Sequence, residues 1–239
     1  MGIWATLAGT AIGLVFGGPL GALAGAAAGG AIDATRARSP ERAQERRRVA
    51  FTIAAIALAA KMARADGEAT AAEFATFQRL FRVEAPEEAN VRRFYDLAKA
   101  SMAGFEAYAL QAADLLGPGT ATLEDLLDAL WLIAAVDGIH QAELDYLAQV
   151  ATLLGFDAAA QARIRRRHLS PAADDPWAIL GIEPGADAAA IKAAYHALVK
   201  RYHPDRALAE GVPAEFIRVA EARMADINAA YDQLTGRRR

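Results

Sequence analysis

The residues best suited to chemistry lie near the carboxyl end of the chain, in the run His203-Pro204-Asp205-Arg206. An imidazole and a carboxylate this close together could act as an acid–base pair. A hydrolase would also need a nucleophile and an oxyanion site. The chain contains no cysteine, no Gly-x-Ser-x-Gly motif and no glycine-rich phosphate-binding motif. We therefore predict that the chain is not an enzyme and carries no cofactor.

Partner binding is the other chemistry that this run could perform. Basic side chains are expected on the polar side of the helix that leads to the run, and they would lie beside His203, Asp205 and Arg206. These basic residues are Lys192, His196, Lys200 and Arg201. Such a strip favours an acidic protein surface. Taken alone, the pattern is equally compatible with a solvated helix face.

Two predicted helices position this run. Apolar residues recur at spacings of three and four from 187 to 202, which is typical of an amphipathic helix. Asp187 is a plausible N-cap for this helix. Pro204 should end it, because proline lacks an amide hydrogen and disfavours helical geometry in the preceding residue. His203 and Asp205 are therefore expected on an exposed loop.

The same apolar period resumes at Phe216 and continues to Leu234. Two apolar faces joined by a short loop should pack as an antiparallel hairpin with the His-Pro-Asp run at its tip. We assign the large apolar residues of this region to the core and not to ligand binding. They are Trp177, Leu180, Tyr195, Leu198, Phe216, Ile227 and Tyr231.

Four ordered motifs in this region resemble a DnaJ-type J domain. They are Asp-Pro-Trp-Ala-Ile-Leu-Gly-Ile at 175–182, Ala-Ile-Lys-Ala-Ala-Tyr at 190–195, Tyr-His-Pro-Asp at 202–205 and Ile-Asn-Ala-Ala-Tyr at 227–231. The resemblance implies a J domain over residues 170–239 that docks on a DnaK-type (heat shock protein 70) chaperone and stimulates its ATP hydrolysis. It also implies that the strip and the His-Pro-Asp-Arg run bind this partner. His196 stands where J domains often carry a permanently charged residue.

The middle of the chain, residues 49–169, predicts an all-α domain. Apolar residues at helical spacing indicate helices at about 71–82, 87–102, 105–116, 123–136, 141–154 and 158–168, and no segment shows the alternation of a strand. Ahead of them, Val49 to Ala65 is rich in alanine. Lys61 and Arg64 interrupt it, so we predict a buried core helix rather than a membrane span.

An internal repeat also marks this domain. Asp66-Gly67 followed by Glu73 is echoed by Asp137-Gly138 followed by Glu143, and each copy joins an apolar helix to the next helix. The repeat resembles the TerB-like (tellurite-resistance) helical domain. The whole order of segments is similar to the DjlA type of membrane-anchored J-domain protein. An alternative function is a TerB-like metal or stress sensor whose J domain is only a docking module.

The acidic residues of the repeat have two interpretations. Asp66, Glu73, Asp137 and Glu143 could converge as oxygen ligands for a hard cation. In the other interpretation Thr70 and Glu73 form a capping box, and the glycines end helices. We favour capping, because the spacing lacks the full ligand set of an EF-hand. We therefore predict no metal site.

The amino-terminal segment predicts a membrane anchor over residues 1–32. No charged residue occurs between Ile3 and Ile32, which exceeds the roughly 20 residues needed to cross a bilayer. Glycines at intervals of four form one helix face that would allow a second helix to approach closely in a homodimer. They are Gly9, Gly13, Gly17, Gly21, Gly25 and Gly29. A break at Gly17-Gly18-Pro19 could instead produce a membrane hairpin.

A basic juxtamembrane linker is expected over residues 33–48. It contains Arg36, Arg38, Arg42, Arg46, Arg47 and Arg48. The positive-inside bias then predicts a single pass through a bacterial-type inner membrane, with the bulk of the chain cytoplasmic and the arginines near lipid headgroups. The formal net charge of -3 gives no basic signature for nucleic acid. The absence of cysteine excludes disulfides and is compatible with a reducing compartment.

Overall fold

The structure, a computed structural model, describes residues 40–65, 70–83, 85–100, 103–169 and 175–236. Every regular element in these ranges is a helix, which confirms the all-α prediction. The predicted anchor and residues 33–39 of the predicted linker lie outside the described residues, and the rest of that linker, residues 40–48, is the first part of a helix. No helix in the described ranges is both long enough and apolar enough to cross a bilayer.

The centre of the fold is helix α2 (Pro40–Met62). Its residues from Val49 onward are almost completely buried, as expected for a helix that is apolar on every side. It packs against α4 (Glu88–Ala98), α5 (Phe105–Leu116) and α6 (Ala121–Ala134). The buried Lys61 donates its Nζ to the carbonyl of Ala103 at 2.7 Å. The prediction of a core helix is confirmed, but this helix begins at Pro40 and not at Val49.

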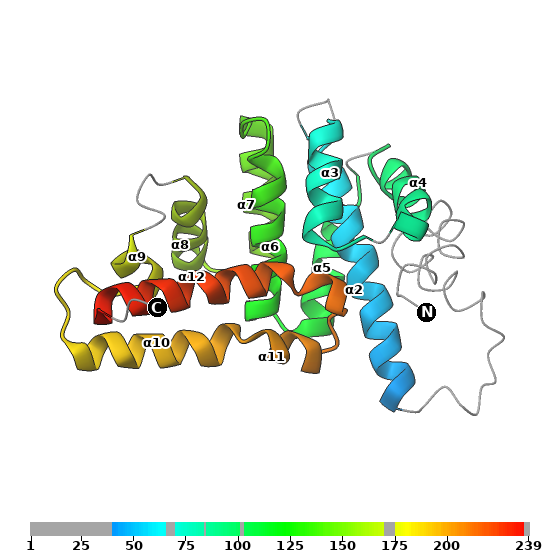
Figure 1. Cartoon of the computed structure of the whole chain (residues 1–239). Coiled ribbons are helices and arrows are strands. Elements are labelled where there is room, and N and C mark those ends of the chain that lie inside the picture. Colours follow the sequence, from blue (N-terminus) through cyan, green and yellow to red (C-terminus); the bar gives the residue numbers. More distant parts are fainter. Residues whose placement is uncertain (1–39, 66–69, 84, 101–102, 170–174, 237–239) are drawn as a thin grey trace.

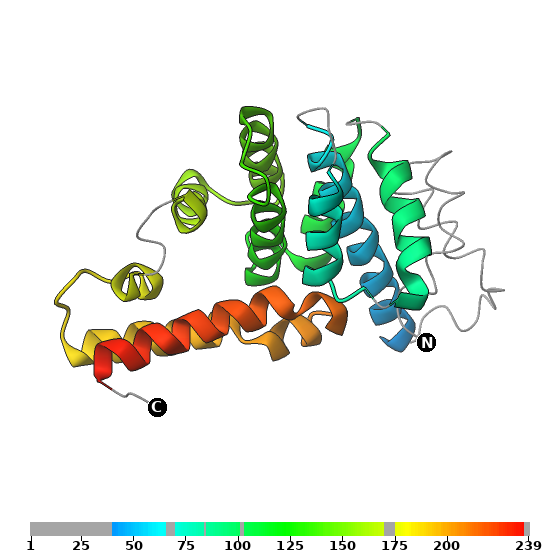
Figure 2. The same ribbon diagram turned by 45° about the horizontal axis from the view of Figure 1, so that its top comes forward.

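The remaining helices of the bundle are α3 (Ala71–Leu80), the 3-10 turn η2 (Ala85–Glu87), α7 (Gln141–Leu153) and α8 (Ala158–Leu169). Figures 1 and 2 show α6 and α7 beside α2, and α3 packs against α6. An aromatic group joins α3 to α4: the rings of Phe74 and Tyr95 lie 4.9 Å apart, centroid to centroid. These elements match the predicted helices, except that α4 ends at Ala98 instead of at 102.

The carboxyl-terminal elements are α9 (Pro176–Leu180), α10 (Ala188–Tyr202), α11 (Pro204–Ala209), the 3-10 turn η3 (Ala214–Phe216) and α12 (Arg218–Thr235). Figure 1 shows α10 and α12 as the predicted antiparallel hairpin, lying across the foot of the bundle. The rings of Tyr195 and Tyr231 stack at 4.1 Å between the two helices. Asp187 caps α10 by accepting the amide of Ala190 at 2.7 Å, as predicted.

The segment after α10 differs from the prediction of a loop. Pro204 ends α10, as expected, but it also occupies the first position of α11, where its missing amide hydrogen costs nothing. His203 is the N-cap of α11, and its Nδ1 accepts the amide of Asp205 at 3.2 Å. Asp205 therefore lies in a short helix. Its exposure was predicted correctly, because 83% of the Asp205 side chain and 49% of the His203 side chain are accessible to solvent.

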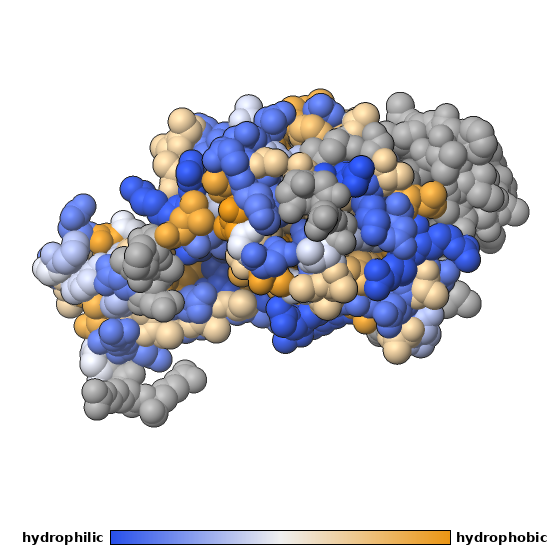
Figure 3. Space-filling view, turned by 90° about the horizontal axis from the view of Figure 1, so that it is seen from above, coloured by the Kyte–Doolittle hydropathy of each residue, from blue (hydrophilic) through white to orange (hydrophobic). Residues whose placement is uncertain are grey.

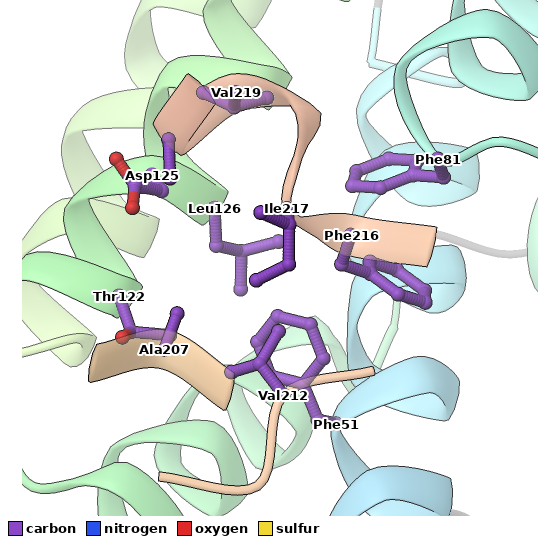
Figure 4. A pocket seen from close by; sticks show the side chains of 11 residues that line it. Phe51, Phe81, Thr122, Asp125, Leu126, Ala207, Val212, Phe216, Ile217 and Val219 are labelled. Atoms are coloured by element: carbon purple, nitrogen blue, oxygen red, sulfur yellow. The ribbon is translucent and has the colours of Figure 1, made fainter. Parts of the chain in front are cut away.

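The hairpin and the bundle share a hydrophobic core. Figure 4 shows the close contact, in which residues of α11, η3 and α12 meet residues of α2, α3 and α6. Phe216 packs edge-on against Phe51 at 5.1 Å and lies 4.7 Å from Phe81. Phe216 is a core residue, as predicted, and its aromatic neighbours belong to the bundle. Elsewhere, hydrophilic residues predominate on the face shown in Figure 3, with hydrophobic residues in smaller groups between them.

Candidate partner-binding surface

An exposed strip runs along α10 toward the His-Pro-Asp turn. Lys192, His196 and Lys200 are all exposed, and their spacing of four places them on one face of the helix. His203 follows directly and is also exposed. The structure therefore brings these predicted residues onto one continuous surface, which we call the α10 strip (Lys192, His196 and Lys200).

The turn itself combines a cation-forming ring and a carboxylate. His203 Nδ1 lies 3.6 Å from a carboxylate oxygen of Asp205. Arg206 Nε donates to Glu210 at 2.9 Å, one helix turn further along α11. Half of the Arg206 side chain remains exposed in this pair. A partner that reaches the turn would therefore meet His203, Asp205 and Arg206 together.

Arg201 does not lie with the strip as predicted. Its Nη2 reaches Glu124 of α6 at 3.4 Å, so the side chain points back to the bundle. Its neighbour Tyr202 is buried and donates its hydroxyl to the same carboxylate at 3.0 Å. The two residues that precede His203 thus contact the bundle, whereas Lys200 faces solvent.

Sequence reasoning missed the buried acidic cluster on α6 that receives these contacts. The cluster consists of Glu124, Asp125 and Asp128, all buried. Its basic partners come from α8, α10 and α12, and they are Arg163, Arg167, His168, Arg201 and Arg223. The only local signal was the presence of three carboxylates within a segment that is otherwise apolar.

The cluster is held by short charged contacts. Arg163 Nη1 and Arg167 Nη2 each lie 2.6 Å from Glu124 Oε1. Arg223 of α12 lies 2.9 Å from Asp125 and also pairs with Asp128. Because all three carboxylates are buried, removing a partner would leave an uncompensated charge away from water, which is strongly destabilising. These contacts therefore fix the hairpin to the bundle.

The pKa values of the cluster follow from burial and from the arginines. Burial alone would raise the pKa of Glu124, but the hydrogen bond from Arg163 and the charges of Arg223 and Arg167 outweigh burial and lower it. Burial raises the pKa of Asp125 to about 6, against the opposing charge of Arg223. Glu124 is therefore a permanent anion, while Asp125 titrates closer to neutral pH.

The two glutamates of the repeat cap helices. Glu73 accepts the amide of Thr70 at 2.7 Å, and Thr70 Oγ1 accepts the amide of Glu73 at 3.2 Å, which confirms the predicted capping box. In the second copy, Glu143 accepts the amide of His140 at 2.8 Å. Burial raises the pKa of Glu73 to about 7, and the charges of Asp137 and Glu143 add to the shift. The charges of the second copy of the repeat therefore act on Glu73 of the first copy.

Within the described ranges, no three His, Asp or Glu side chains are grouped as metal ligands would be. Asp66, the fourth predicted candidate, lies outside those ranges. The same is true of the predicted dimer face from Gly9 to Gly29.

Three family models match consecutive parts of the chain. "Co-chaperone DjlA transmembrane domain" matches residues 1–40, "Tellurite resistance protein TerB" residues 52–166 and "DnaJ domain" residues 175–239. The chain is a DjlA-type J-domain protein with a TerB-like domain. The bundle from α2 to α8 carries the TerB match, and the hairpin carries the DnaJ match. The match over residues 1–40 indicates a membrane-anchored protein.

Curated relatives support this assignment. The co-chaperone protein DjlA of Escherichia coli (strain K12) is 30% identical over 109 residues, which cover 43% of this chain and 40% of the relative. DjlA of Yersinia pestis is 36% identical over 72 residues, or 30% and 26% of the two chains. DjlA of Vibrio vulnificus (strain YJ016) is 40% identical over 58 residues, or 24% and 20%. The matched part thus spans well under two thirds of each relative. No solved structure matches the chain.

Proposed function

We propose that the chain is a membrane-anchored co-chaperone whose J domain docks on a DnaK-type chaperone and stimulates its ATP hydrolysis. The match to the DnaJ domain and the names of the relatives support this function. The observation that carries it is the continuity of the α10 strip with the exposed His203 and Asp205. In this role the chain regulates an ATPase and catalyses nothing itself.

The chemistry of the surface defines the partner's docking site. Lys192 and Lys200 place two positive charges along one side of α10, and they favour an acidic surface on the chaperone. Attraction between such surfaces accelerates encounter and weakens as salt is added. The His-Pro-Asp turn lies at the end of the strip, so the same encounter brings His203 and Asp205 to the chaperone. Arg206 extends the site on the far side of the turn.

The anchor would place this surface at the membrane. A single pass with the arginines of residues 33–48 on the cytoplasmic side leaves both helical domains in the cytoplasm, beside the inner membrane. The linker is short, because α2 begins at Pro40. The arginines ahead of α2 would contact anionic lipid headgroups.

The glycine face of the anchor would pair two copies of the chain. Small residues from Gly9 to Gly29 permit close approach of two helices in lipid. Replacing Gly13 and Gly25 by leucine should reduce dimerisation in a membrane reporter assay while insertion stays normal. The same replacements at Ala11 and Ala22, off that face, should be mild. Equal loss of dimer in both double variants would rule out the face.

The direct test of the function is single-turnover ATP hydrolysis by the DnaK-type chaperone of the same organism, with the full chain in lipid nanodiscs. Wild-type chain should accelerate hydrolysis. His203→Gln and Asp205→Asn should each abolish the acceleration while the bundle stays folded, since both side chains are exposed and lie outside the core. His140→Gln, which alters an exposed histidine outside the surface, should behave as wild type. Acceleration that survives His203→Gln would contradict the proposal, as would a wild-type chain without effect.

A further inference from the structure

Helix α6 of the TerB-like domain contacts the J domain on both sides of the His-Pro-Asp turn. Before the turn, Tyr202 donates its hydroxyl to Glu124 Oε2 at 3.0 Å. After the turn, Thr122 Oγ1 donates to Glu210 Oε2 at 2.7 Å, and Glu210 is the C-cap of α11. Thr122 and Glu124 are two residues apart, so one short stretch of α6 holds both ends of the segment from Tyr202 to Glu210.

Apolar contacts fill the space between these two hydrogen bonds. Ala207 of α11 and the following Val212 are buried, and Figure 4 shows them with Thr122 and Leu126 of α6 around one small pocket. The inner side of α11 therefore packs on the bundle. Its outer side, which carries Asp205, remains in solvent.

The acceptor on α6 is itself held rigidly. The Glu124 side chain is completely buried, and Arg163 and Arg167 of α8 bind its carboxylate from the bundle side at 2.6 Å. Hydrogen bonds of this kind, with both partners charged, are among the strongest in proteins. The guanidinium of Arg223 lies 4.4 Å from the centre of the Tyr202 ring and restrains that ring as well. Tyr202 thus donates to an atom that has little freedom to move.

These contacts leave the partner-binding surface open. Lys200 and His203 are exposed on either side of the buried Tyr202, and Asp205 is exposed beyond them. An inhibitory contact would cover these side chains. A contact that fixes the backbone beneath them and leaves them in solvent instead prepares them for binding, because less conformational freedom is then lost when the partner arrives.

We propose that Glu124 is a positioning residue for the J domain: through Tyr202, and together with the Thr122–Glu210 contact, it fixes the His-Pro-Asp turn relative to the α10 strip. Glu124 and Thr122 act through the J domain and do not touch the chaperone. The TerB-like domain is then part of the device that activates the partner's ATPase. This inference rests on the proposed co-chaperone function.

The test compares two tyrosines of α10 in the full chain. Tyr202→Phe removes only the hydroxyl that reaches Glu124. Tyr195→Phe is the matched control, because its hydroxyl donates to Asn228 within the J domain at 3.0 Å. In a titration against the chaperone, Tyr202→Phe should lower the maximal stimulation of ATP hydrolysis about 5- to 10-fold, the size expected for the loss of one ordinary intramolecular hydrogen bond. The half-saturating concentration should change little, because the strip is intact. Tyr195→Phe should match wild type.

A second readout needs no chaperone. Amide hydrogen exchange over residues 203–210 should accelerate in Tyr202→Phe and in Thr122→Val, while α3 to α5 keep wild-type protection. Tyr195→Phe should leave residues 203–210 protected. Unchanged exchange together with wild-type stimulation in Tyr202→Phe would overturn the inference. Increased stimulation by Tyr202→Phe would also overturn the inference, because the Tyr202–Glu124 contact would then inhibit the J domain. A wild-type chain without any stimulation would refute the proposed function instead, and exchange would still decide whether α6 holds the turn.

Discussion

Lys200 and Arg201 are adjacent basic residues with different surroundings, and this difference gives a prediction at the scale of single residues. Lys200 faces solvent in the α10 strip, whereas Arg201 reaches the buried Glu124. Lys200→Glu should weaken association with the DnaK-type chaperone, more at low salt than at high salt, without changing stability. Arg201→Glu should lower the melting temperature, because it places a second carboxylate beside Glu124.

Binding titrations at two salt concentrations and thermal unfolding of both variants check this pair. A loss of affinity in Lys200→Glu that does not depend on salt would indicate that the strip does not act through charge. Equal melting temperatures for the two variants would show that Arg201 contributes only to the surface.

Glu73 gives a second prediction for a single residue, in the pH dependence of stability. Its pKa is raised from 4.5 to about 7 by burial, so the fold favours the protonated side chain. The stabilisation is fully present below pH 4.5 and is lost as the pH rises through about 7. Glu73→Gln cannot ionise. It should therefore lose less stability than wild type between pH 5 and pH 8, by about 1 to 3 kcal/mol.

Urea denaturation of wild type and Glu73→Gln at the two pH values measures this difference directly. Parallel losses of stability in the two proteins would mean that Glu73 is ionised in the folded chain throughout this range.

At the scale of elements, the long helices were predictable and the short one was not. Helices α10 and α12 each present one apolar face to the core. The buried Ile191 in α10 and Ile227 in α12 each belong to a series of apolar residues at helical spacing. Helix α11 has six residues, too few to show a period. Pro204 gave the opposite signal, because a proline that ends one helix can also begin the next. The sequence therefore predicted the turn's exposure but not its helical form.

Only the part of the candidate site that lies on a single helix was predicted correctly. The α10 strip follows from spacing along a single segment. The position of Arg201 depends on Glu124, which lies in a distant helix of another domain. No local pattern reports such a pairing. The acidic cluster was overlooked for the same reason, since its cations come from α8, α10 and α12.

Phe216, which precedes α12, allows a prediction about how these elements depend on each other. Its ring fills the space between Phe51 of α2 and Phe81 at the end of α3. Phe216→Ala should cost about 3 to 5 kcal/mol in the free energy of unfolding, as is usual when a buried aromatic ring is removed. Chemical denaturation monitored by circular dichroism measures this cost. Phe216 would not be a core residue if the variant unfolded at the same denaturant concentration as wild type.

At the scale of the whole molecule, the two helical domains are bound into one unit. The shared core around Phe216 and the charged contacts at Glu124 join segments that the sequence presented as separate domains. The amino-acid composition does not reveal this interface. Ala207 and Val212 are buried in it, but small apolar residues of this kind are equally common in the core of an isolated hairpin. The exact domain boundaries, with the J domain beginning at residue 170, stay a prediction.

We expect the J domain to work while it is docked on the TerB-like domain. An exposed ion pair between the domains, Arg82 with Glu221, provides the means to test this. The chain has no cysteine, so Arg82→Cys with Glu221→Cys can be joined selectively by a short bifunctional maleimide. Arg82→Cys with Gln233→Cys is the control, because Gln233 lies roughly 18 Å further along α12.

The measurement is single-turnover ATP hydrolysis by the DnaK-type chaperone, with the linked chain compared with the same variant left unlinked. We predict that the Arg82→Cys, Glu221→Cys variant links efficiently within one chain, that the control pair does not, and that the linked chain stimulates hydrolysis as strongly as the unlinked one. Failure of the first pair to link, or loss of stimulation once it is linked, would contradict the claim.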